Sequence, residues 1–216
     1  ALQINSPGGS PVQSEMISRR IRELSEKKNV PVLAFVEDVA ASGGYWLACA
    51  ADEIFASKAS IIGSIGVVSS GFGFDKAIDK IGIDRRLYTS GENKAILDPF
   101  LPENKDDVKR LKAIQKELHN QFISFVKSRR GSKISNKDKD IFTGAFWSGE
   151  KSLDLGLIDA FGEMKFILKE RFGEDTKIKE FAPKKKFFGL GNLFSGALDV
   201  LIYKVEERIS FKRFGV

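Results

Sequence analysis

The chain has 216 residues, a formal net charge of +6, and 42% hydrophobic and 30% charged residues. Such a chain is long enough for one sizeable α/β domain, alone or with an appendage. Its single cysteine, Cys49, excludes an internal disulfide and a thiolate metal cluster, and its apolar neighbours indicate a buried small hydrophobe. The positive charge gathers at residues 184–186 and 204–213. Without a nucleic-acid motif that interleaves aromatic residues, this pattern favours an anionic membrane surface over nucleic acid.

The first apolar run, residues 2–4, resembles the end of a strand, so we expect the domain to begin before residue 1. A Pro-Gly-Gly turn follows, and then an amphipathic pattern predicts a helix over about residues 12–28. Gly8 and Gly9, just before this helix, could turn backbone N–H groups toward a ligand oxyanion. By itself, such a turn more often only reverses the chain.

The apolar, β-branched run at residues 30–36 predicts a buried strand, and residues 45–51 predict a buried helix. Ser42 lies at their junction and is followed by Gly43 and Gly44. A serine there can be a nucleophile, because the helix dipole stabilises a developing alkoxide and glycines admit a substrate carbonyl. It can also be a simple helix N-cap, which this stretch alone favours.

The rest of the chain continues to alternate between strand-like and helix-like apolar patterns. Further strands are predicted at residues 52–57, 60–68, 84–89 and 177–181, and further helices at 74–81, 104–130, 150–155 and 163–172. The only histidine, His119, lies in the longest helix, where we interpret it as a partly exposed structural residue. It is therefore the single candidate base for a Ser-His-Asp triad.

A boundary is predicted at Pro183 and the lysines that follow, dividing a domain at residues 1–183 from a tail at 184–216. Residues 187–203 are strongly apolar and are bracketed by basic side chains. This pattern fits an amphipathic helix at a membrane interface. It fits equally a helix packed on the domain or on a neighbouring subunit.

Several short motifs occur in a specific order along residues 1–180. They are Asn5-Ser6-Pro7-Gly8-Gly9, Ala41-Ser42-Gly43-Gly44-Tyr45, Ile62-Gly63-Ser64-Ile65-Gly66-Val67, Ser90-Gly91-Glu92-Asn93-Lys94, Phe142-Thr143-Gly144 and Leu155-Gly156-Leu157-Ile158-Asp159. In this order the chain resembles the S49 family of serine peptidases, the relatives of signal peptide peptidase A. Each motif alone is weak, and their order makes the resemblance specific.

The resemblance implies an α/β fold of the ClpP/crotonase type, a spiral of strand-strand-helix units. It implies Ser42 as nucleophile, Lys94 as general base and Ser64 as the serine that hydrogen-bonds this lysine. Gly8, Gly9 and Gly43 would form the oxyanion hole. The chemistry agrees, because lysine is a base only when neutral and the apolar residues after Lys94 could desolvate it. The alternative for Lys94 is a solvated surface lysine.

We therefore expect a membrane-associated serine endopeptidase that degrades cleaved signal peptides and other hydrophobic peptides. It would need no metal or cofactor, would not bind nucleic acid and, by resemblance, would form homo-oligomers. We expect it at the bacterial inner membrane, with the side left open. Two rivals share the fold: a crotonase-type acyl-CoA enzyme, and a catalytically inactive membrane scaffold.

Overall fold

The computed structural model describes residues 1–135, 139–181, 205 and 208–215. In chain order the elements are β1 (Leu2–Ser6), α1 (Pro11–Lys28), β2 (Leu33–Ala41), α2 (Gly43–Ala48), β3 (Glu53–Ala56), β4 (Ile61–Gly63), α3 (Asp75–Lys80), α4 (Lys105–Arg130), β5 (Phe146–Ser148), α5 (Gly149–Asp154), β6 (Ala160–Phe161) and α6 (Met164–Phe172).

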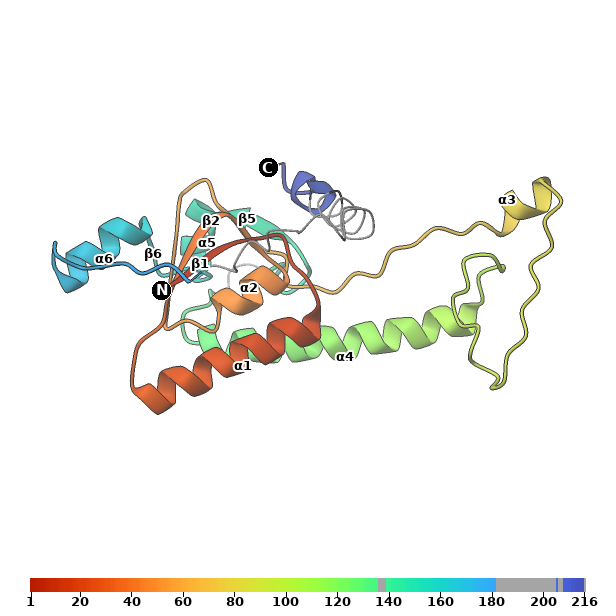
Figure 1. Ribbon diagram of the computed structural model, residues 1–216, viewed down its shortest axis with the longest axis horizontal. Coiled ribbons are helices and arrows are strands. Elements are labelled where there is room, and N and C mark those ends of the chain that lie inside the picture. The colour runs from red at the N-terminus through yellow and green to blue at the C-terminus, as the bar shows by residue number, and fades with distance from the viewer. Residues whose placement is uncertain (136–138, 182–204, 206–207, 216) are drawn as a thin grey trace, which may run out of the picture.

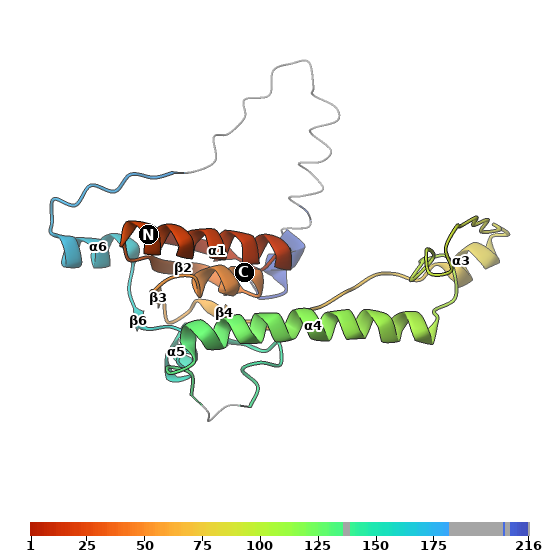
Figure 2. The same ribbon diagram turned by 90° about the horizontal axis from the view of Figure 1, so that it is seen from below.

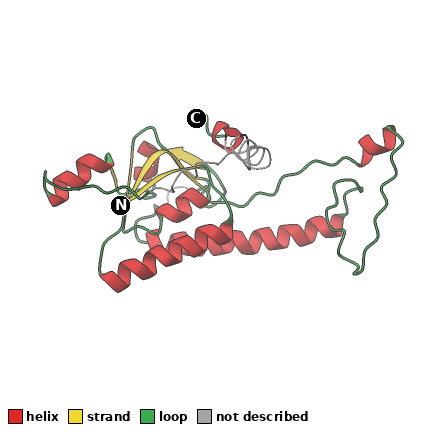
Figure 3. Cartoon of the chain, in the orientation of Figure 1, coloured by secondary structure: helices red, strands yellow, loops and turns green. Residues whose placement is uncertain are grey.

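The strands form one curled sheet at the centre of the molecule, with helices packed around it (Figures 1 and 3). The central strand, β2, pairs in parallel with β1. It also pairs in parallel with β3 through its first half and with β4 through its last three residues. β6 extends the sheet beyond β3, and β5 runs antiparallel to β4. This arrangement confirms the α/β fold class.

Strand β2 is longer than predicted and shifted toward the C-terminus. It begins at Leu33, after Pro31, whose missing N–H cannot join a ladder. It continues to Ala41, so the strand reaches Ser42 directly, whereas the predicted strand ended at residue 36. By contrast, β4 is only three residues long, because Ser64 has a φ of 52° and leaves the extended conformation.

Two predicted strands, at residues 84–89 and 177–181, are wrong. Both segments are irregular in the structure. A strand needs a neighbour for its N–H and C=O groups, and neither segment has one among the described residues. Residues 84–89 are instead held by Arg85, which forms an ion pair with Asp98 at 2.7 Å and lies over the ring of Phe100.

The main core lies between the sheet and the helices α2 and α4. Trp46 of α2 stacks on Phe122 and Phe125 of α4, with ring centroids 4.6 and 5.5 Å apart. Such aromatic pairs add about 0.5–1.5 kcal/mol each beyond the area that they bury. These contacts fix the C-terminal half of α4 against the helix that follows Ser42.

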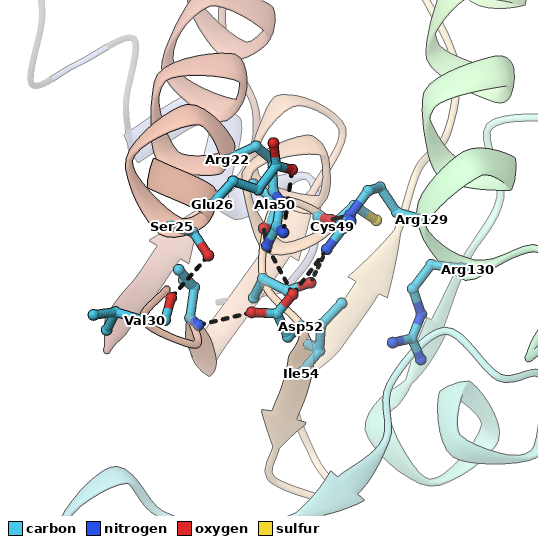
Figure 4. A network of polar contacts seen from close by, with 12 residues as sticks. Arg22, Ser25, Glu26, Val30, Cys49, Ala50, Asp52, Ile54, Arg129 and Arg130 are labelled. Carbon is cyan, nitrogen blue, oxygen red and sulfur yellow. Dashed lines mark hydrogen bonds and ion pairs between the residues drawn. The ribbon is translucent and has the colours of Figure 1, made fainter. Parts of the chain in front are cut away.

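A polar network ties the helices α1 and α4 to the loop before β3. Arg22 of α1 and Arg129 of α4 reach the carboxylate of Asp52 from two sides, at 2.7 and 3.3 Å (Figure 4). The same carboxylate accepts the N–H of Val32 at 2.8 Å. Burial raises the pKa of Asp52, but these hydrogen bonds and charges outweigh it and leave the pKa below its usual value.

An arm projects from this core. It comprises the residues after β4, the short helix α3 and the N-terminal half of α4, and it extends far from the sheet in both views (Figures 1 and 2). All residues from Gly66 to Gln121 are described, and none of them is buried. Apolar side chains stand open on it, including Phe72 at 80% and Tyr88 at 91% exposure.

Candidate active site

Three parallel strands end at the same edge of the sheet, and each is followed by a predicted site residue. β1 leads into Gly8 and Gly9, β2 into Ser42, and β4 into Ser64. The carboxyl ends of parallel strands are a common place for binding and catalytic groups. Local sequence therefore supplies each group, and the parallel pairing brings the groups together.

Ser42 occupies the turn between β2 and α2 in a rare backbone conformation, with φ 50° and ψ −119°. Its N–H donates to the carbonyl of Gly63 at 2.8 Å, and its carbonyl accepts the N–H of Trp46 at 2.9 Å. Ser42 occupies the N-cap position of α2, but its side chain makes no capping hydrogen bond to the described residues. Strained backbone of this kind is concentrated at functional sites.

The Pro-Gly-Gly loop lies directly against this serine. A Cβ atom on Gly8, whose φ is 138°, would lie 3.1 Å from the Cβ of Ser42 and 3.5 Å from its Oγ. A Cβ on Gly43 would lie 3.1 Å from the backbone nitrogen of Gly9. As the first residue of α2, Gly43 has an N–H without an intrahelical acceptor. Glycine is needed at positions 8 and 43 because the loop and the start of α2 approach each other closely there.

A cavity of about 500 Å³ opens at this edge, and its walls include Ser42, Ser64, Gly8 and Gly9. Gly43 is buried behind Ser42. Ser64 is itself buried, and its N–H donates to the carbonyl of Ala145 at 2.7 Å. Five of the six predicted site residues are thus gathered in one place.

Lys94 is the exception. Its side chain is exposed and does not line this cavity in the described part of the chain. It belongs to the segment between α3 and α4, at the far end of the arm (Figures 1 and 2). Within a single chain, the structure does not bring the predicted base to the predicted nucleophile.

Sequence reasoning missed two parts of the cavity wall. The first is His119 of α4, which is half-buried as expected but also lines the cavity with Ser42. The second is the end of the chain, where Arg213 and Phe214 line the same cavity. Phe214 is buried against Val39 and Ala41 of β2 and meets the ring of Phe146 edge-on at 5.0 Å.

These last residues thus pack on the domain through Phe214. The only signal for it in the sequence was the spacing of Phe211 and Phe214, which places both rings on one face of a helical turn. The apolar segment 187–203 lies outside the described residues. Where the chain is described, no helix combines the length and apolar character needed to cross a membrane.

Neither the cysteine, nor the second groove, nor a metal site offers an alternative reactive centre to Ser42 in the described part of the chain. Cys49 is fully buried, as expected, and burial raises the pKa of its thiol to about 12, so the nucleophilic thiolate does not form. A wider groove of about 1960 Å³ runs beside β1 and α6, and it contains none of the predicted site residues. The described ranges contain no group of three or more His, Cys, Asp or Glu side chains able to hold a metal ion.

Comparison with known proteins identifies the family of the chain. The model of peptidase family S49 matches residues 24–186 of the chain. A putative protease of Methanocaldococcus jannaschii, MJ0651, is 36% identical over 78% of the chain and 53% of its own length. A probable protease SohB of Buchnera aphidicola (subsp. Schlechtendalia chinensis) is 37% identical over 73% of the chain and 50% of its own length.

The chain belongs to peptidase family S49. Its relatives named as proteases support a peptidase activity, and the family assignment favours this over the acyl-CoA alternative. A Brucella abortus protein with the name Na(+)/H(+) antiporter NhaA is 46% identical over the whole chain, but the match covers only 31% of that longer protein. The chain thus spans about a third to a half of the length of these relatives.

Proposed function

We propose that the chain carries the nucleophilic half of a serine endopeptidase site, with Ser42 as the nucleophile. The observation that carries this proposal is the strained backbone of Ser42, held between the Pro-Gly-Gly loop and the start of α2 at the wall of a cavity. A side chain that only capped a helix would have no need of that conformation.

In the reaction, Oγ of Ser42 attacks the scissile carbonyl carbon while Lys94 takes the hydroxyl proton. The N–H groups of Gly9 and Gly43 hydrogen-bond the resulting oxyanion, with Gly8 fixing their separation. The carbon–nitrogen bond then breaks, and Lys94 returns the proton to the leaving amine. Water hydrolyses the acyl ester and regenerates Ser42.

We propose that Lys94 reaches Ser42 from a second copy of the chain. Two observations support this. The segment that carries Lys94 lies far from the cavity in its own chain, and the arm leaves large apolar side chains uncovered. An exposed apolar surface of this kind is typical of an interaction site. A homo-oligomer would cover the arm and complete the dyad at once, with Ser64 orienting the amine.

The proposed substrates are hydrophobic peptides bound as extended strands, including cleaved signal peptides, at the surface of the bacterial inner membrane. The basic residues of the tail favour attachment to anionic lipid, at about 1 kcal/mol for each side chain near the surface. Because Arg213 and Phe214 line the cavity, the end of the tail would contact the substrate as well.

The nucleophile is tested by labelling with a fluorophosphonate probe. The wild type should react at one serine, and Ser42→Ala should neither react nor cleave peptides while it unfolds at an unchanged temperature. Labelling at another serine, or an unreactive wild type, would contradict the assignment. The second result would favour the inactive scaffold.

Sharing of the site between copies is tested by mixing two inactive variants. Ser42→Ala and Lys94→Ala should each be inactive, and subunit exchange between them should restore cleavage, because mixed assemblies contain some intact pairs. Lys80→Ala, another exposed lysine of the arm, should stay active and is the matched control. No recovery despite proven subunit exchange would mean that Lys94 acts within its own chain, or that it is not the base.

A further inference from the structure

The loop that carries Ser64 is held in an unusual shape. Ser64 has a φ of 52°, and its carbonyl accepts the N–H of Gly66 at 2.9 Å. Between them, Ile65 is fully buried. A non-glycine residue with positive φ is stable only when its surroundings hold it there. The contacts of this loop therefore hold the backbone position from which the Ser64 side chain extends.

One of these contacts comes from His119. Its Nε2 lies 2.9 Å from the carbonyl oxygen of Ile65. Since a carbonyl can only accept, Nε2 must carry the hydrogen, and in the neutral ring Nδ1 is then the unprotonated nitrogen. The hydrogen bond thus fixes the tautomer and occupies the N–H in a structural contact.

The helix that bears His119 is firmly placed. One turn along α4, Phe122 is buried and stacks on Trp46, whose backbone N–H donates to the carbonyl of Ser42. On the other side, Ile65 follows Ser64 and Gly63, and the carbonyl of Gly63 accepts the N–H of Ser42. The contacts form a closed ring: Ser42, Trp46, Phe122, His119, Ile65, Gly63 and Ser42 again.

We propose that His119 is a positioning residue for peptide hydrolysis, and that it acts through this hydrogen bond by holding the Ser64 loop in register with Ser42. The inference rests on the proposed role of Ser42 and extends it to a residue that has no proton-transfer duty. His119 closes the ring, and without its N–H the loop loses its hydrogen bond to α4.

The test compares His119→Gln, whose side-chain amide can still donate to Ile65, with His119→Leu, which cannot. Misplacement by about 1 Å costs about 100-fold in rate, so we expect His119→Leu to lose about 10- to 100-fold in kcat with little change in KM. His119→Gln should stay near the wild type. Thermal unfolding and assembly state, measured in parallel, identify a variant that has merely misfolded.

Two outcomes would overturn the proposal. If His119→Leu is as active as the wild type, the hydrogen bond has no role in the reaction. If folded His119→Gln is as inactive as His119→Leu, the imidazole transfers protons and is not a positioning group.

A third measurement is independent of activity. Because the chain has one histidine, isotopic labelling of histidine nitrogen gives the signals of a single ring in the wild type and in Ser42→Ala. The Nε2-protonated tautomer is expected, and the other tautomer would contradict the hydrogen bond. This readout stands even if Ser42 is not the nucleophile, so failure of the proposed function and failure of this inference can be told apart.

Discussion

Replacing Gly8 with alanine should strongly lower the rate of peptide cleavage while the domain stays folded. Gly8 has a φ of 138°, and an added Cβ would lie 3.1 Å from the Cβ of Ser42. Backbone strain of this kind costs about 1–3 kcal/mol, which a folded domain can absorb. The contact also pushes the Pro-Gly-Gly loop away from Ser42 by a few tenths of an ångström.

The catalytic loss should be larger than the loss of stability. Displacing the loop moves the N–H of Gly9 away from the oxyanion, and loss of one such donor costs about 100- to 1,000-fold in kcat. We expect kcat of Gly8→Ala to fall by about 100-fold, the lower end of that range, because the donor is shifted and not removed. The assay is cleavage of a fluorogenic hydrophobic peptide, with thermal unfolding measured on the same samples.

Gly9→Ala is the matched control for this prediction. A Cβ on Gly9 meets nothing within 4 Å, its φ is not in the left-handed region, and the N–H is retained. Its kcat should therefore fall far less than that of Gly8→Ala. Wild-type turnover by Gly8→Ala would refute the close approach of the loop to Ser42. Equal losses in the two variants would refute the argument from steric contact.

Three further predictions concern the support of the site. Arg130, at 1% exposure, binds Asp159 at 2.6 Å and the carbonyl of Gly156 at 2.8 Å. Arg130→Met should therefore lower the free energy of unfolding, measured in urea, by about 3 kcal/mol, and a loss below about 1 kcal/mol would contradict this. Burial raises the pKa of Asp159, but hydrogen bonds from Arg130 and Lys133 outweigh it and lower the pKa. The stability that Asp159 contributes is therefore present above its ordinary pKa of 3.8 and lost as pH falls below that value. Acid should destabilise the wild type more than Asp159→Asn, and equal acid sensitivity of the two proteins would contradict this prediction. Phe214→Ala removes one wall of the cavity and should raise KM for hydrophobic peptides more than it lowers kcat, and an unchanged KM would separate the chain end from substrate binding.

Local patterns in the sequence predicted the helices well. The expected helices at 12–28 and 104–130 correspond to Pro11–Lys28 and Lys105–Arg130. Their ends are marked by caps that the nearby sequence supplies, such as the Ser10 side chain that accepts the N–H of Gln13. The strand at 84–89 failed because a strand is defined by its neighbour, and β-branched or aromatic composition says nothing about whether a neighbour is present.

The residues of the candidate site also fall into those that local sequence predicts and those that it does not. Ser42, Ser64 and the glycine pairs each follow a short apolar strand, so the sequence could identify them one by one. His119 and Phe214 come from remote elements with no motif of their own. Their places at the cavity depend on the packing of α4 beside Trp46 and of the chain end on β2, which are long-range contacts.

The position of the arm connects assembly with catalysis in the proposed mechanism. The parts of the site that need precise geometry lie on the rigid sheet edge, where parallel pairing and the ring of contacts through His119 hold them. The proposed base, Lys94, lies on a segment in which no residue is buried within its own chain. A segment without a buried core is ordered by what it contacts, so the partner that covers the arm would also fix Lys94. If that partner is a second copy, the lysine is delivered only when the subunits are in place. An isolated subunit would then hold its nucleophile ready without the group that activates it, and proteolysis would depend on protein concentration as assembly does.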